Sequence, residues 1–215
     1  MFENEMILRE PLFYLLVAFS ALLTLGFFWG RKMNRRIFSE TFQALVDTVK
    51  PDDQTFTAIG GVVGYHANLL VKRKGPVSRV DATITLLPRQ SWLYFPVSKL
   101  LRRWDRLFVT LHLRQAPSEE GHLIEAKYAA FRGPEITSAN RLNREDVRWG
   151  GRSFHLYTQG MHARDALAGF MKKNMDPAII RHIAVVPERR LCFIFMIPGR
   201  REAGRCFASF YRWAT

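Results

Sequence analysis

Histidine and carboxylate side chains are the residues of this chain that could carry acid–base or metal chemistry. The imidazole of histidine exchanges protons near neutral pH, and a neighbouring carboxylate can orient it or share a metal ion. The first candidates for such a group fall in or beside strand-like segments: His66, Asp81, His112 and Glu125. An enzyme that acts on a membrane-associated substrate, through polar residues converging from a sheet, is therefore one hypothesis.

The spacing of these residue types argues against that hypothesis. The chain has six histidines and two cysteines, and none of them forms an HExxH, a CxxC or another close ligand pair. The sequence has no GxSxG motif, and the glycine-rich stretch 59–64 lacks both the GxGxxG spacing and the Lys-Ser/Thr of a phosphate loop. Separately hydrogen-bonded or exposed histidines, and a strand bend at 59–64, are the simpler interpretation. The sequence predicts no cofactor and no metal, and it favours a protein that is not an enzyme.

The most distinctive segment is 90–106, in which aromatic and basic residues are interleaved. Such a composition is typical of an element in the membrane interface, and it also suits contact with a protein partner. A connection that fills the core, with its basic side chains in solvent, is the third interpretation, because aromatic residues are most often buried. The residues predicted to contact a membrane or a partner are Trp92, Tyr94, Phe95, Lys99, Arg102, Arg103 and Trp104.

The charge of the chain indicates an anionic surface as a partner. The net charge is +13, and residues 31–215 carry 31 basic and 16 acidic side chains, a net charge of +15. Each Lys or Arg near an anionic bilayer adds about 1 kcal/mol of attraction. The basic turn Lys72, Arg73 and Lys74 could add to this attraction or could be a solvated loop. Nucleic acid is the other polyanion to consider, but a membrane tether makes lipid the simpler partner, so no nucleic acid is expected.

An uncharged stretch at 12–30 supplies that tether. Its 19 residues are about as many as a helix needs to cross ~30 Å of hydrocarbon. A cleaved signal peptide would have a basic leader and small residues at a cleavage site, whereas this leader is acidic and the stretch ends in large aromatic residues. A buried core helix fits poorly because the stretch is apolar on all sides. We therefore predict a retained single-pass transmembrane helix.

A basic cluster follows the stretch at once and sets its predicted orientation. Lys and Arg near a membrane span are retained on the cytoplasmic side. The cluster consists of Arg31, Lys32, Arg35 and Arg36. Residues 1–11 are then a short extracytoplasmic N-terminus, and 51–215 form a basic cytoplasmic domain at the cell membrane.

Hydrophobic periodicity predicts the elements that position these residues. Helical spacing of apolar residues makes 31–50 an amphipathic juxtamembrane helix, which continues from the span and stops at Pro51. Alternation then predicts strand-like segments: 56–72, 79–86, 107–114, 122–131, 152–158, 181–186 and 190–197. Residues 133–146 resemble a surface loop, 161–175 a helix, and 206–213 either a strand or a helix. The fold class is α+β, with a mostly antiparallel sheet and two or three helices after the transmembrane helix.

These features together predict a membrane-anchored binding or assembly protein. Its domain would dock to anionic lipid headgroups and to a protein partner or a second copy, for example as an accessory subunit of a membrane complex. Gly26 and Gly30 form a GxxxG motif at the inner end of the span. This spacing lets two helices approach closely, although glycine is also simply common in membrane helices. A homodimer or a protein partner is the expectation.

Overall fold

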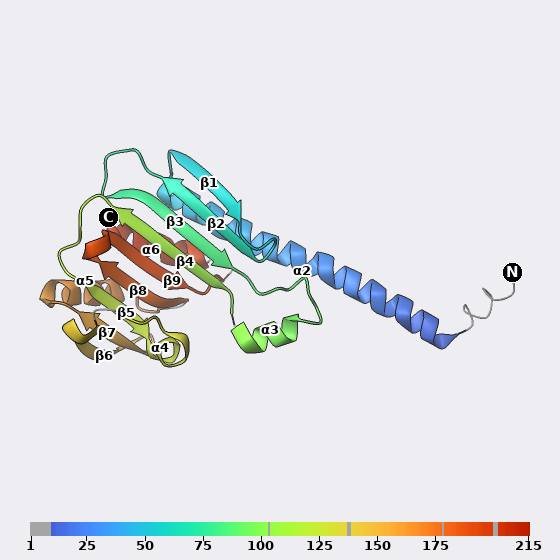
Figure 1. Cartoon of the computed structure of the whole chain (residues 1–215). Helices are drawn as coiled ribbons and strands as arrows, with labels where there is room; N and C mark the ends of the chain where they lie inside the picture. Colours follow the sequence, from blue (N-terminus) through green and yellow to red (C-terminus); the bar gives the residue numbers. More distant parts are fainter. Residues whose placement is uncertain (1–9, 103, 137–138, 178, 200–201) are drawn as a thin grey trace.

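The structure, a computed structural model, describes residues 10–102, 104–136, 139–177, 179–199 and 202–215. One long helix extends away from a body built on a single sheet (Figure 1). The fold is α+β, as predicted. Arg103 lies outside the described residues, and so does the side chain of Arg102.

The long helix α2 (Pro11–Val49) is continuous over 39 residues. Proline suits its first turn, where a missing N–H costs no hydrogen bond. The helix ends at Lys50, whose φ of 48° is left-handed, and Pro51 follows. The predicted span and juxtamembrane helix are therefore one element. Its second half packs on the body of the protein through Phe42, Leu45 and Val49, whereas only 6% of its most apolar window is buried.

Nine strands form one sheet in which every hydrogen-bonded pair is antiparallel. Its order is β1-β2-β3-β4-β9-β8-β5-β7-β6. The strands are β1 (Asp53–Ala58), β2 (Gly64–Leu70), β3 (Val77–Thr85), β4 (Arg106–Leu113), β5 (Gly121–Glu125), β6 (Asn143–Trp149), β7 (Arg152–Thr158), β8 (Ile180–Val186) and β9 (Leu191–Met196).

Three helices cover one face of this sheet. They are the second half of α2, α5 (Met161–Lys173) and α6 (Glu202–Ala214). Alternate strand residues such as Leu111, Leu123 and Ile194 join Leu45 and Phe207 in a single buried core. α6 approaches α2 closely, because a Cβ on Gly204 would lie 2.7 Å from the Cβ of Ala44.

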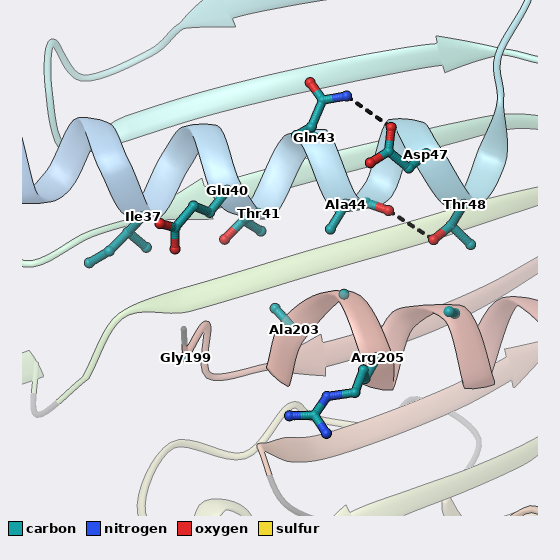
Figure 2. A pocket seen from close by; sticks show the side chains of 12 residues that line it. Ile37, Glu40, Thr41, Gln43, Ala44, Asp47, Thr48, Gly199, Ala203 and Arg205 are labelled. Carbon is teal, nitrogen blue, oxygen red and sulfur yellow. Dashed lines mark hydrogen bonds between the residues drawn. The ribbon is translucent and has the colours of Figure 1, made fainter. Parts of the chain in front are cut away.

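A groove of about 570 Å³ lies between these two helices. Figure 2 shows the side chains of Ile37, Thr41 and Ala44 facing α6. Along α2, the Gln43 side chain donates to Asp47 at 2.9 Å, and the Thr48 hydroxyl donates to the Ala44 carbonyl at 2.8 Å. These polar groups therefore bond within the helix that carries them.

The opposite face of the sheet is half-buried and carries polar and aromatic residues, among them Asp81, Phe108 and His112. The short helix α4 (Ala126–Arg132) contacts this face, with the ring of Tyr128 4.9 Å from that of Phe195. Another short helix, α3 (Phe95–Arg102), lies on the side from which α2 extends outward (Figure 1).

The sequence-based assignment was wrong in three places. The segment 122–131 is not one strand, because α4 follows β5 directly. The expected loop 133–146 contains a 3₁₀ turn (Ala139–Arg141) and the first four residues of β6, all of which are exposed and so show no alternation. The domain after residue 51 holds four α-helices among its described residues rather than two or three, α6 being the ambiguous segment.

Candidate functional site

Two glycines of α2 let a loop of the same chain lie directly on the helix. A Cβ on Gly26 would lie 2.4 Å from the indole ring of Trp92, and one on Gly30 would lie 2.1 Å from the carbonyl oxygen of Arg89. Such distances leave no room for any side chain larger than hydrogen. The GxxxG motif therefore has a contact within the chain, and its role in helix association stays a prediction.

A buried polar network lies one turn further along α2. The Asn34 side chain donates to the Leu87 carbonyl at 2.9 Å and accepts from Arg89 Nη1 at 3.0 Å. The Arg89 guanidinium in turn holds both carboxylate oxygens of Asp105, at 2.9 and 2.7 Å. Asp105 Oδ1 also accepts the Leu87 N–H at 2.7 Å. We call Asn34, Arg89 and Asp105 the junction network, because they tie α2 to the chain on both sides of α3.

The junction network holds an unusually apolar surface at the inner end of the predicted span. Leu100 is 79% exposed and Leu93 is 70% exposed. We call the exposed apolar residues of this segment the 92–101 surface; they are Trp92, Leu93, Tyr94, Val97, Leu100 and Leu101. Contiguous exposed apolar residues on a domain mark an interaction site.

The other predicted contact residues of this segment differ in position. Lys99 is exposed beside the apolar surface, whereas Phe95 and Trp104 are half-buried. The backbone carbonyl of Phe95 accepts a hydrogen bond from the Ser98 hydroxyl at 2.8 Å, which helps to close the first turn of α3. The segment is therefore neither a core connection nor wholly exposed.

The basic cluster lies on α2 at the same level as the loop, on the side of the helix turned away from Gly30 and Asn34. Arg31, Lys32, Arg35 and Arg36 are all exposed. Arg36 pairs with Glu40 at 2.6 Å. The positive charge of the cluster and the 92–101 surface therefore lie at the same height along the axis of α2.

The basic turn Lys72, Arg73 and Lys74 lies at the other end of α2. The Arg73 side chain donates to the carbonyls of Val49 and Lys50, where it caps the helix. The backbone N–H groups of Lys72 and Arg73 bind the Asp52 carboxylate and hold its pKa below the usual range. Val49 is roughly 35 Å from Gly26 along the helix axis. This turn therefore does not adjoin the 92–101 surface.

Three of the four catalytic candidates lie on one face of the sheet. Asp81 accepts from His112 at 2.8 Å, from Asn68 at 2.7 Å and from Arg79 at 3.1 Å. His66 is on β2, and its Nδ1 lies 2.9 Å from the hydroxyl of Thr83 on β3.

Glu125 is separate from this group. It is the last residue of β5, and it pairs with Arg181 at 3.0 Å and with Arg152 at 3.4 Å. The structure thus brings Asp81 and His112 together in a surface ion-pair network and does not add Glu125 to them.

Two buried histidines that the sequence did not single out lie across β5 and β8. The rings of His122 and His182 stack at 5.7 Å, and Glu120 holds His122 Nε2 at 2.9 Å. Burial, with a smaller effect of His122, lowers the pKa of His182 to about 3, so His182 is neutral. Among the described residues, no three His, Cys, Asp or Glu side chains are arranged to hold a metal ion.

α2 is the helix of the described chain that is long and apolar enough to cross a membrane, a test that a signal sequence or a core helix can also meet. No family model matches the chain, and no curated protein is detectably similar to it.

Proposed function

We propose that this chain is a single-pass membrane protein whose domain docks onto the lipid surface from which its own helix emerges. The observation that carries the proposal is the 92–101 surface, held beside the inner end of an uncovered apolar helix. Docking would present the half-buried sheet face to a protein partner or a second copy. The protein is then a binding or assembly component.

The first support for the proposal is the length of the uncovered helix. Residues 12–30 span about 28 Å of helix, close to the ~30 Å thickness of a bilayer core. Most of these side chains are exposed. Each apolar side chain left in water forgoes about 1.5–3 kcal/mol of burial free energy, so such a helix needs an external cover.

The second support is the chemistry of the short helix. Amphipathic segments with aromatic and aliphatic residues on one side and basic residues on the other lie about 5–10 Å deep in the bilayer interface. The 92–101 surface has this composition, with Lys99 beside it. The net charge of +15 on residues 31–215 adds attraction to anionic lipids.

The orientation follows from the same residues. With Arg31, Lys32, Arg35 and Arg36 on the cytoplasmic side, the domain is cytoplasmic and the N-terminus is outside. We propose that this membrane is the cell membrane.

A depth measurement tests the proposal. A nitroxide label at Leu100→Cys, with both native cysteines replaced by alanine and the full chain in vesicles containing anionic lipid, should be accessible to oxygen and shielded from a water-soluble nickel relaxant. A matched label at Lys74→Cys, at the far end of α2, should be accessible to nickel. Equal access of nickel to both labels would refute docking of the 92–101 surface.

A further inference from the structure

A pocket of about 570 Å³ opens at the same edge of the sheet as the 92–101 surface. Strand register places the start of β4 beside the end of β9, and the end of β9 beside the start of β8. Trp104, two residues after α3, forms part of the wall. The remaining wall comes from α4, the end of β5 and the starts of β7 and β8.

Cations outnumber anions in this pocket. Lys127, Arg152 and Arg181 line it together with a single carboxylate, Glu125. Both oxygens of Glu125 are already engaged, one by Arg181 at 3.0 Å and one by Arg152 at 3.4 Å.

The guanidinium of Arg181 is largely removed from water, with only 12% of its side chain exposed. Burial lowers the pKa of Arg181, and the positive charge of Arg152 adds to this effect while Glu125 opposes it. Glu125 balances only one of the two guanidinium charges of Arg152 and Arg181, so a second anion in the pocket would compensate the other.

Trp104, which lines the pocket, has a hydrogen-bond donor without a partner among the described residues. This donor, Nε1, is buried. A tryptophan N–H can only donate, so it requires an acceptor. Buried donors are nearly always satisfied in folded proteins, so an oxygen of a bound ligand would stabilise this N–H once the indole ring shifts toward the pocket.

We infer that this pocket binds a phosphate group, supplied by the headgroup of an anionic phospholipid. Arginine forks match phosphate oxygens in a bidentate geometry, and the tryptophan N–H and a lysine provide the remaining donors. The aromatic side chains of Tyr128 and Phe131 line the pocket beside the polar groups. The lipid source rests on the proposed function, because only docking of the 92–101 surface brings the pocket to the bilayer.

Native mass spectrometry of the full-length chain in nonionic detergent tests this inference. Short-chain phosphatidic acid should bind to the protein, and short-chain phosphatidylcholine should bind at least ~10-fold more weakly because its headgroup carries no net negative charge. Inorganic phosphate should compete with phosphatidic acid for the pocket.

Three variants locate the binding. Trp104→Phe keeps the aromatic wall and removes the N–H, and Arg152→Gln removes one cation; each should weaken phosphatidic acid binding about 10-fold. Lys172→Gln, which removes an exposed lysine of α5 outside the pocket, should leave it unchanged. Equal weakening by Lys172→Gln, or no effect of the two pocket variants, would overturn the phosphate site.

The arms of the experiment separate the two sources of phosphate and the two proposals. Binding of inorganic phosphate without binding of phosphatidic acid would keep the phosphate site and overturn the lipid headgroup. A shielded label at Leu100→Cys together with no binding of either ligand would overturn the pocket alone. A nickel-accessible label at Leu100→Cys together with pocket binding of inorganic phosphate would overturn docking and, with it, the lipid source, and would keep the phosphate site.

Discussion

At the scale of single residues, the orientation of the domain depends on a few buried polar side chains. Asn34 sits within a run of basic residues, and its sequence context gives no sign of burial. It is nonetheless fully buried, and its amide bonds Leu87 and Arg89, more than 50 residues along the chain. A buried amide without partners would cost about 1–3 kcal/mol, so these bonds fix which face of α2 meets the body of the protein.

The ion pair in this network gives a stability prediction. Asp105→Asn should lower the free energy of unfolding by about 3–5 kcal/mol, because it leaves the Arg89 guanidinium buried without its charge partner. Arg36→Gln breaks an exposed pair and should cost less than about 0.5 kcal/mol. Urea unfolding in detergent micelles, followed by tryptophan fluorescence, measures both. Similar losses for the two variants would show that the junction network does not hold the fold.

The buried imidazole of His182 predicts a pH dependence. Its pKa is lowered from 6.5 to about 3 in the folded protein. Between pH 6.5 and pH 3 the imidazole is therefore protonated in the unfolded chain and neutral in the folded chain. The free energy of unfolding falls as the pH drops below about 6.5, with a slope of up to about 1.4 kcal/mol per pH unit. His182→Phe should flatten the unfolding free energy between pH 7 and pH 5. The exposed His162→Gln should not change that profile, and parallel profiles for all three proteins would contradict the assignment.

At the scale of elements, the same Gly→Ala substitution should have opposite effects at two helical glycines. One of them, Gly30, is in contact with the 87–92 loop, and the other, Gly169, is in open space. Gly30→Ala places a methyl group against the Arg89 backbone and should destabilise the protein by about 1–3 kcal/mol. Gly169→Ala, in open space on α5, should stabilise it by up to about 1 kcal/mol, because alanine favours a helix. Urea unfolding compares the two variants.

Sedimentation in detergent separates this contact from helix association. If Gly30 serves only a dimer, Gly30→Ala will reduce dimer content and leave the unfolding free energy of the monomer unaffected. If the loop contact is its role, the monomer itself will be destabilised.

The elements that periodicity predicted well are those with one buried side. β3 and β4 alternate cleanly because one face of each meets the helices, and α2 shows its helical stripe where it packs on the body of the protein. β6 was missed because it is an edge strand whose first five residues include no buried position. α4 was missed because it follows the fully buried β5 with no glycine or proline between them.

At the scale of the whole molecule, the uncovered helix, the 92–101 surface and the phosphate pocket share one side of the domain. Composition alone identified 90–106 as the distinctive segment, because aromatic and basic residues are interleaved there. Its location could not be predicted, since it depends on Asn34, Arg89 and Asp105 meeting across long stretches of chain. The sequence left the basic turn at 72–74 either as a further contact with lipid or as a solvated loop, and the structure places it at the opposite end of α2, where Arg73 caps the helix.

The topology of the whole chain gives the last prediction. With the basic cluster at 31–36 retained inside, a cysteine at the exposed Ser118 should not react with an impermeant maleimide in intact cells, and it should react after permeabilisation. A cysteine at Glu10, before the span, should react in intact cells. Both native cysteines are replaced by alanine so that only the introduced thiol is counted. Labelling at position 118 but not at position 10 in intact cells would invert the orientation, whereas labelling at both would mean that the helix does not span the membrane.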